Sequence, residues 1–323
     1  MTDQPIAFDD PAAPAAMEGV TDAPRAIAVV TNRKSGTNAR DRDAVDRAMA
    51  EFGRDRARLY TWAPKHQKIE EVVDRALEDG ADTVVAAGGD GTAMAVAGAL
   101  LGKSAAFAVL PLGTFNYFAR GLGLPEDPAE AARAVLDAPA HPIRVGQVNG
   151  TVFLNNASLG IYPAVLKQRE SVYARYGRRR IMAHWSAAQT FMKFQRPMHL
   201  QIEADGREIE ARTPLLFVSR SAFQLEKFGL SGAEAISEDG FAVLIARGET
   251  RADLFRTALR LCTRSAVEGR DYDFLAARHL RVRSSKSRSL LAYDGEKRLS
   301  PSPFEFRMSR APLTIRLPQG ASG

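Results

Sequence analysis

The sequence contains a single cysteine, Cys262, among 323 residues, and this scarcity excludes several classes of protein. A disulfide framework and a zinc site built from several cysteines both need more thiols than one. The five histidines are scattered at positions 66, 141, 184, 199 and 279, so a histidine-based metal cluster is not expected. The G-x-S-x-G pattern is also missing, which argues against a serine hydrolase.

Long hydrophobic runs are missing as well. No stretch approaches the roughly 20 apolar residues that a membrane-spanning helix needs. The acidic start, MTDQPIAFDD, has neither the basic nor the apolar region of a secretory signal. With 45% hydrophobic and 25% charged residues, the composition is that of a soluble globular protein. We therefore expect a cytoplasmic protein.

The charge balance is basic, with a formal net charge of +6 and a pI near 9.5. This favours anionic partners such as nucleotides, nucleic acid or acidic lipid surfaces, but it does not choose among them. A basic soluble enzyme without such a partner fits equally well. Because no recognised nucleic-acid motif accompanies the charge, nucleic acid is not an expected partner.

The chain divides into three parts by texture. Residues 1–24 are rich in proline and alanine without periodicity, which predicts a disordered extension. Residues 25–143 alternate strand and helix patterns, which predicts a Rossmann-like α/β domain with a mainly parallel sheet. Residues 144–323 hold short alternating strands, with turns at Asn149-Gly150 and Asp205-Gly206, which predicts a mainly antiparallel β-sandwich.

A glycine-rich stretch, Gly88-Gly89-Asp90-Gly91-Thr92, separates the strand pattern DTVVAA from the helical pattern TAMAVAGALLG. Glycines at a strand end let backbone N–H groups approach phosphate oxygens. Asp90 is suited to hold magnesium or orient a nucleotide, and the Thr92 hydroxyl to bond a phosphate. Taken alone, the stretch is explained equally well as a tight structural turn.

Two better-known phosphate motifs do not fit the spacing. The dinucleotide pattern G-x-G-x-x-G would need a glycine where Met94 stands. The stretch from Gly98 to Ser104 resembles a Walker motif but is one residue short, and it follows a helix instead of a strand. Both interpretations are discarded.

Three further strand ends offer polar or small residues. Asn32 follows the first predicted strand, Thr61 ends the second, and the run PLGTFNYFAR, residues 111–120, follows the fourth. The carboxyl ends of parallel strands meet at one edge of a sheet. The sequence therefore predicts that all four loops face one polyphosphate.

GGDGT followed some twenty residues later by PLGT-x-N-x-FAR resembles the catalytic domain of the diacylglycerol kinase family. Its relatives include bacterial lipid kinases, sphingosine and ceramide kinases and, more distantly, NAD kinases. The likeness runs from about Arg25 to the C-terminus and is looser in the second domain. There, FLNNASLG at 153–160 and YDGE at 293–296 resemble family landmarks. Met94 and Tyr117 depart from the family pattern, which has Asn and Asp there in many members.

The resemblance implies ATP and Mg²⁺ as cofactors and assigns roles to particular residues. Glu296 would be the general base, with Asp294 beside it and Asp90 in the same cleft. Asp239, in SEDGF, resembles a position where some bacterial members bind a structural magnesium. The residues expected to contact ATP are Asn32, Thr61, Gly88, Gly89, Asp90, Gly91, Thr92, Thr114 and Asn116. Without the GGDGT motif elsewhere in the chain, the sequence Asp294-Gly295-Glu296 would be more typical of an exposed β-turn.

The function expected from this resemblance is an ATP-dependent lipid kinase that phosphorylates diacylglycerol or a similar membrane lipid, with a place in phospholipid metabolism. Arginines interleaved with aromatic residues over 171–196 suit contact with an anionic membrane surface, although the same pattern also fits a helix packed on its own domain. We therefore expect peripheral membrane association, and a homodimer is possible because relatives often dimerise. The alternatives are a kinase for a sphingoid base or for a soluble acceptor such as NAD, and a nucleotide-binding regulator that has lost catalysis.

Overall fold

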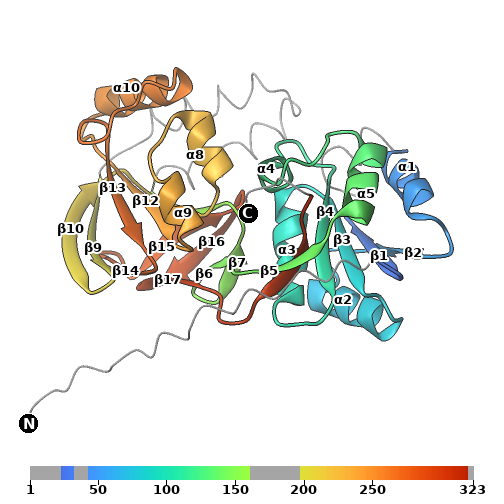
Figure 1. Cartoon of the computed structure of the whole chain (residues 1–323). Helices are drawn as coiled ribbons and strands as arrows, with labels where there is room; N and C mark the ends of the chain where they lie inside the picture. The colour runs from blue at the N-terminus through green and yellow to red at the C-terminus, as the bar shows by residue number, and fades with distance from the viewer. Residues whose placement is uncertain (1–22, 33–42, 161–196, 319–323) are drawn as a thin grey trace, which may run out of the picture.

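The computed structural model of the chain has two domains joined side by side (Figure 1) and describes residues 23–32, 43–160 and 197–318. The predicted extension at 1–22 and the arginine- and aromatic-rich segment at 171–196 lie outside the described residues. Within the described ranges, no helix is both long and apolar enough to cross a membrane.

The first domain is built on a six-stranded sheet with the order β2-β1-β3-β4-β18-β5. Strands β1 to β4 run parallel to their neighbours, as the alternating pattern predicts. Helix α1 packs on α5, and α2 on α3. The elements are β1 (Ile27–Thr31), α1 (Ala44–Phe52), β2 (Ala57–Thr61), α2 (Ile69–Glu78), β3 (Thr83–Gly88), α3 (Asp90–Leu100), β4 (Ala106–Pro111), α4 (Tyr117–Gly121), α5 (Pro128–Asp137) and β5 (Ala140–Ile143).

The last strand of the chain, β18 (Leu313–Arg316), lies in the sheet of the first domain. It pairs parallel to β4 and antiparallel to β5, between the two. The sequence pattern places residues 313–316 in the range expected for the second domain, yet their hydrogen bonds are with the first. The backbone therefore crosses between the domains twice, at residues 143–146 and again before β18.

The second domain is a sandwich of two six-stranded sheets, ordered β10-β9-β14-β17-β6-β7 and β13-β12-β11-β8-β15-β16. Neighbouring strands in both sheets pair antiparallel, which confirms the predicted fold class. The strands are β6 (Gly146–Val148), β7 (Thr151–Phe153), β8 (Asn156–Gly160), β9 (Met198–Ala204), β10 (Arg207–Thr213), β11 (Leu215–Ser219), β12 (Phe241–Ala246), β13 (Tyr272–Ala277), β14 (His279–Ser284), β15 (Arg288–Tyr293), β16 (Glu296–Pro301) and β17 (Phe304–Met308). The helices are α8 (Ala222–Phe228), α9 (Ala233–Ser237) and α10 (Arg251–Cys262).

Alternating apolar residues from the two sheets meet between them in one core. Phe153, Phe304 and Phe306 come from one sheet, Phe241 and Leu159 from the other, and all are fully buried. Removing such side chains from water supplies about 1.5–3 kcal/mol each. A separate core cluster, which includes Val85, Leu110 and Ile315, underlies the first domain. This cluster of the first domain also takes in Val152 and Leu154 of the second domain, so the two domains pack together beside the candidate site.

Hairpin turns set the strand register at the positions that the sequence predicts. Asn149 and Asp205 have φ of 49° and 47°, and the glycine after each has φ of 81°. Two consecutive residues with positive φ are typical of the type I′ turn that joins antiparallel strands tightly. Asp294 and Gly295 repeat this geometry, with φ of 45° and 88°, between β15 and β16.

Candidate functional site

The carboxyl ends of β1 to β4 lie at one edge of the parallel sheet, and they bring together most residues that the sequence assigns to ATP. Asn32 follows β1, Thr61 is the last residue of β2 and Gly88 the last of β3. Thr114 lies exposed in the loop between β4 and α4. Adjacent parallel strands ending in register explain this gathering, since Thr31 pairs with Thr61 and Ala87 with Leu110.

The glycine stretch differs from its prediction in one respect. Helix α3 begins at Asp90 and not at Thr92, so Asp90, Gly91 and Thr92 form its first turn. A helix N-terminus carries backbone N–H groups without intrahelical partners and a partial positive charge, both suited to phosphate. The stretch therefore presents a helix start, and not only a flexible loop, to the sheet edge.

Thr92 and Gly88 pack against each other inside this turn. The Thr92 side chain is buried, and a methyl group added at Gly88 would lie 2.6 Å from Thr92 Oγ1. Gly88 is thus required by the threonine above it. The arrangement gives Thr92 a packing role, which its sequence pattern did not indicate.

The loop after β4 is held against the glycine stretch by Asn116. Its side-chain oxygen accepts from the Gly113 N–H at 2.8 Å, and its amide donates to the carbonyl oxygens of Pro111 and Gly113. A methyl group added at Gly113 would lie 2.3 Å from Gly89 Cα, so the two loops touch backbone to backbone. Asn116 therefore shapes the predicted phosphate cradle from within its own loop.

Asp90 joins the two domains through hydrogen bonds. Its carboxylate accepts from the Phe118 N–H at 3.0 Å and from Nδ2 of Asn155 at 3.3 Å. Burial raises the pKa of Asp90, and the donated hydrogen bonds counter that rise only in part. Asn155 lies between β7 and β8 in the second domain, so this contact crosses the cleft. The NN pair at 155–156 is noted in the sequence as a landmark, but no local pattern shows this partner.

Asp294 is buried in the hairpin turn between β15 and β16. Its oxygens accept backbone N–H groups from Leu154 at 2.5 Å, Asn155 at 2.8 Å and Asn156 at 3.1 Å. Burial nevertheless raises the pKa of Asp294 to about 7, and the nearby Asp90 charge adds to the rise. Because the carboxylate is enclosed by its own domain, its position suits holding the 154–156 segment in place.

Glu296 follows two residues later and faces the first domain. A methyl group added at Gly91 would lie 3.1 Å from Glu296 Oε1 and 3.8 Å from its Cγ. The carboxylate thus lies directly over the first turn of α3, and the Glu296 side chain is exposed to solvent. Of the predicted carboxylates, Glu296 is the one that combines solvent access with contact to the glycine stretch.

Helices α4 and α8 face each other beside this cleft, a feature that the sequence does not predict. The Tyr117 ring stacks on Phe115 with centroids 5.7 Å apart, and Lys227 Nζ lies 4.7 Å from the Tyr117 centroid. Arg120 lies over the Phe223 ring at 5.8 Å. Tyr117, which departs from the family pattern, therefore has a cation from the second domain packed on its ring.

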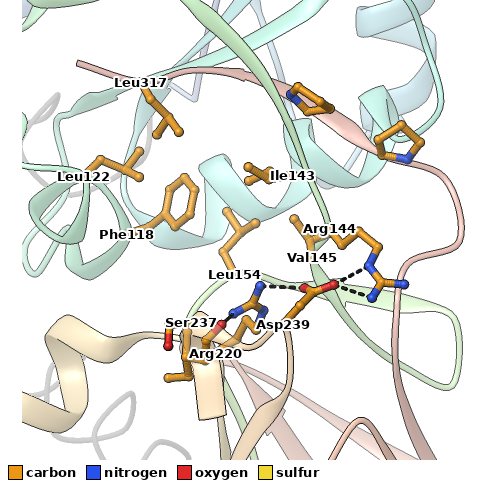
Figure 2. A pocket seen from close by; sticks show the side chains of 13 residues that line it. Phe118, Leu122, Ile143, Arg144, Val145, Leu154, Arg220, Ser237, Asp239 and Leu317 are labelled. Atoms are coloured by element: carbon orange, nitrogen blue, oxygen red, sulfur yellow. Dashed lines mark hydrogen bonds and ion pairs between the residues drawn. The ribbon is translucent and has the colours of Figure 1, made fainter. Parts of the chain in front are cut away.

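A cavity of about 290 Å³ lies between the domains, and its lining includes the side chains of Phe118 and Leu154 (Figure 2). Its polar wall is Asp239, held between two arginines. Arg144 Nε donates to Asp239 Oδ2 at 2.5 Å, and Arg220 Nη2 donates to Asp239 Oδ1 at 3.0 Å. Arg220 Nη1 also donates to the Ile236 carbonyl oxygen at 2.8 Å.

These contacts bear on the magnesium that the resemblance implies at Asp239. Both carboxylate oxygens and the Ile236 carbonyl already accept from guanidinium groups, and two positive charges meet one negative charge. A hard divalent cation needs several free oxygen ligands. Within the described ranges, no group of three or more His, Cys, Asp or Glu side chains is placed to hold a metal ion. The residues around Asp239 therefore do not fit a metal ion.

The chain is similar in sequence to known kinases. The family model described as "Diacylglycerol kinase catalytic domain" matches residues 26–148. A Bacillus subtilis protein named "Diacylglycerol kinase" is 30% identical over 224 residues, which cover 67% of this chain and 71% of that relative. A Pseudomonas aeruginosa protein named "Probable lipid kinase YegS-like" is 46% identical over 136 residues. That match covers 42% of this chain and 44% of the relative.

Solved structures show the same fold at low identity. A diacylglycerol kinase from Bacillus anthracis has a TM-score of 0.63 at 15% identity, covering 93% of this chain and 99% of that one. An NAD kinase from Archaeoglobus fulgidus, solved with ATP, has a TM-score of 0.52 at 14% identity over 91% of this chain and 95% of that one. Both likenesses concern the fold alone.

Proposed function

Because this chain belongs to the diacylglycerol kinase family, we propose that it transfers the γ-phosphoryl group of ATP to a hydroxyl of diacylglycerol or a similar membrane lipid. The observation that carries the proposal is the position of Glu296. Its Oε1 lies over Gly91 in the first turn of α3, which brings a solvent-accessible carboxylate to a helix N-terminus. That pairing supports Glu296 as the proton acceptor and the start of α3 as the phosphate-binding element.

The phosphates of ATP would lie against the first turn of α3 and the loop from Gly113 to Asn116. The partial positive charge of the helix start favours the anionic phosphates, and the glycines keep the approach free of side chains. Mg²⁺ would arrive with ATP as part of the substrate and neutralise charge on the β- and γ-phosphates. Asn32, Thr61 and Thr114 complete the proposed nucleotide site at the same sheet edge.

The reaction requires one proton transfer and one substitution at phosphorus. Glu296 accepts the proton of the lipid hydroxyl, and the resulting oxygen forms a bond to the γ-phosphorus. The bond from that phosphorus to the bridging oxygen breaks, and ADP leaves with the electron pair. Glu296 then releases its proton to water, so the carboxylate is restored for the next turnover.

Asp90 and Asp294 have positioning roles in this proposal. Asp90 accepts from Phe118 and Asn155, and Asp294 accepts from the three amides of residues 154–156. Asn155 contacts both carboxylates, through its side chain and its backbone. These bonds fix the distance between α3 and the hairpin that carries Glu296. An open or shifted cleft would separate the base from the phosphate, which reduces the rate steeply.

Labelled ATP and a panel of acceptors test the assignment. The purified full chain should transfer the γ-phosphate to diacylglycerol in mixed micelles and transfer much less to a sphingoid base or to NAD. Transfer to NAD in preference to every lipid would replace the lipid assignment by the soluble-acceptor alternative. Tight ATP binding without transfer to any acceptor would instead favour a nucleotide-binding regulator and contradict the proposal.

A further inference from the structure

Helix α10 exposes large apolar side chains that the rest of the described surface mostly hides. Across residues 23–32, 43–160 and 197–318, five large hydrophobic residues are strongly exposed, and three of them belong to α10 and the loop after it. Phe255 is 61% exposed, Leu259 is 55% exposed and Val267 is 48% exposed. Exposed apolar residues that cluster, unlike those scattered singly, are typical of interaction sites.

Phe255 and Leu259 are four residues apart, so they lie one turn apart on the same side of the helix. Leu254, next to Phe255 and about 100° around the helix from it, is only 4% exposed. Helix α10 therefore has a buried apolar side chain, Leu254, and two exposed ones, Phe255 and Leu259. We name Phe255, Arg256 and Leu259 the α10 face.

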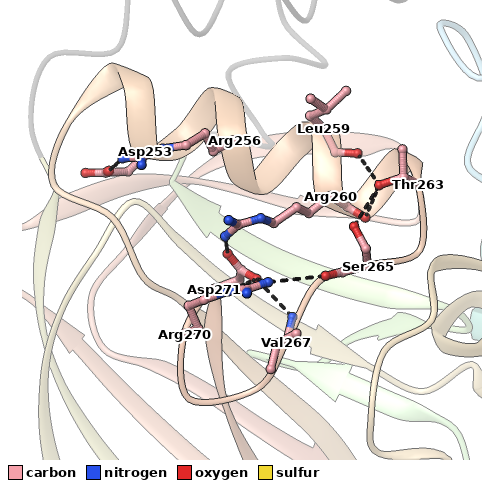
Figure 3. Close-up of polar contacts among 9 residues, drawn as sticks. All are labelled: Asp253, Arg256, Leu259, Arg260, Thr263, Ser265, Val267, Arg270 and Asp271. Atoms are coloured by element: carbon pink, nitrogen blue, oxygen red, sulfur yellow. Dashed lines mark hydrogen bonds and ion pairs between the residues drawn. The ribbon is translucent and has the colours of Figure 1, made fainter.

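Hydrogen bonds within the helix and an ion pair to the domain stabilise α10 (Figure 3). Its N-terminus has a complete capping box, in which the Thr250 side chain accepts from Asp253 N–H and the Asp253 carboxylate accepts from Thr250 N–H at 3.0 Å. These Thr250 contacts, above all its hydroxyl, hold the pKa of Asp253 at about 2. Near its C-terminus, Arg260 Nη1 donates at 2.5 Å to the buried Asp271 carboxylate. Among the described residues, this stabilised helix keeps Phe255 and Leu259 exposed, which suits an interaction surface.

The charge on and around the helix indicates the chemistry of that partner. Residues 251–264 contain four arginines and one acidic residue, Asp253. Arg256, on the α10 face itself, forms an exposed ion pair with Asp253, and its side chain is 63% exposed. Arginines beside exposed Phe and Leu on a helix are suited to lie at the interface of a bilayer with anionic lipids. The net charge of +6 for the whole chain acts in the same direction.

Contacts along the surface connect α10 to the mouth of the proposed site. Arg264, just after α10, donates from Nη2 to the Glu226 carbonyl oxygen at 2.7 Å in α8. In α8, Lys227 packs on the Tyr117 ring and Phe223 contacts Arg120, and both partners belong to α4 across the cleft. In Figure 1, α10 lies beyond α8 at the end of the second domain where α8 faces α4. A membrane against the α10 face would therefore lie near the cleft entrance.

We propose that the α10 face docks the protein on an anionic lipid bilayer, with Phe255 and Leu259 entering the headgroup region and Arg256 contacting lipid phosphates. This inference deepens the proposed function, on which it rests for its biological meaning. Its occupant is a lipid surface and not a second copy of the chain. Binding itself requires no turnover, so it can be measured whether or not the kinase assignment holds.

Vesicle co-sedimentation of the full chain tests this directly. The wild type should sediment with vesicles of phosphatidylcholine containing about one-third phosphatidylglycerol, and much less with phosphatidylcholine alone or at high salt. The double variant Phe255→Ser/Leu259→Ser should bind anionic vesicles about tenfold more weakly, since it loses two apolar anchors. The matched control, Leu59→Ser/Leu299→Ser, removes two comparably exposed side chains from β2 and β16 and should bind like the wild type.

Two controls keep this result specific. Both double variants should keep the wild-type unfolding midpoint, because all four side chains are exposed. Kinase activity on a detergent-dispersed acceptor should be equal in the wild type and the α10 variant, whereas activity on vesicle-embedded lipid should fall only in the α10 variant. The inference is overturned if the wild type does not bind anionic vesicles, or if it binds zwitterionic vesicles equally well. It is also overturned if the α10 variant binds anionic vesicles as well as the wild type does, or if the substitutions only convert a dimer to a monomer.

Discussion

Oε1 of Glu296 in the second domain lies 3.1 Å from the point where a Cβ on Gly91 of the first domain would stand. The two residues are more than two hundred positions apart in the sequence. Their proximity brings the candidate base of the second domain to the start of α3 in the first domain. Gly91 is in a helical turn and does not have a positive φ, so its backbone conformation does not require glycine. The close approach of Glu296 is what leaves little room for a side chain there.

Gly91→Ala should separate stability from activity. Alanine in a helix is favoured over glycine by about 0.5–1 kcal/mol, so the unfolding free energy should hold or rise. Lipid phosphorylation should fall about tenfold or more, because the new methyl group displaces the Glu296 carboxylate. Gly98→Ala is the matched control on the same helix, since its methyl group would meet Val152 at an ordinary 3.7 Å. Equal lipid kinase activity of the two variants would refute the claim that Gly91 leaves room for the Glu296 carboxylate.

Gly113→Ala should damage both the fold and nucleotide binding. A methyl group there would lie 2.3 Å from Gly89 Cα, and backbone atoms cannot yield as a flexible side chain does. We expect a loss of about 1–3 kcal/mol in unfolding free energy from such overpacking. Weaker ATP binding, measured by calorimetry below the melting range, should accompany it. Unchanged ATP affinity would show that the contact of the two loops does not form the nucleotide site.

Asp294 should make stability depend on pH between about 4 and 7. Its folded-state pKa of about 7 lies above the ordinary 3.8, so the folded protein binds the proton more tightly than the unfolded chain. The resulting stabilisation is complete below pH 4 and disappears as the pH rises through 7. At about 1.4 kcal/mol for each pKa unit, it amounts to about 4 kcal/mol.

Urea unfolding of the wild type and of Asp294→Asn across this pH range measures the effect. The unfolding free energy of the wild type minus that of the variant should fall as the pH rises. The wild type loses the stabilisation that its protonated carboxyl provides, whereas the variant lacks the titrating group. A difference that stays constant from pH 4 to 8 would mean that the Asp294 carboxyl titrates near its ordinary pKa.

The arginines around Asp239 should make this part of the fold independent of divalent cations. The unfolding midpoint without ATP should be the same in EDTA and in excess Mg²⁺. Asp239→Asn should cost about 1–2 kcal/mol, because it leaves Arg144 and Arg220 without their carboxylate in a partly solvated site. An unfolding midpoint that rises with Mg²⁺ in the wild type and not in Asp239→Asn would show that Asp239 does bind a metal ion.

The parts of the fold that local patterns determine could be predicted from the sequence. Strand and helix periods, the Asn149-Gly150 and Asp205-Gly206 turns and the gathering of strand ends all follow from residue type and spacing. The position of β18 could not be predicted in this way. A short alternating strand reads alike in either domain, and its partners β4 and β5 lie far away in the chain.

The candidate site shows the same division. The glycine stretch and Glu296 are visible in the sequence because a family pattern marks them. The partners that give Asp90, Asp239 and Tyr117 their surroundings are not visible there, because Asn155, Arg144 and Lys227 come from other elements. Such contacts depend on how two domains pack, and no local pattern records that.

The rate of lipid phosphorylation by Glu296→Gln tests the central claim most directly. Glutamine keeps the shape of the side chain over Gly91 but cannot accept the hydroxyl proton, so kcat should fall about 10²–10⁴-fold. ATP affinity and the unfolding midpoint should not change, and Glu208→Gln, an exposed control on β10, should retain full activity. A Glu296→Gln enzyme that phosphorylates lipid at the wild-type rate would contradict the account.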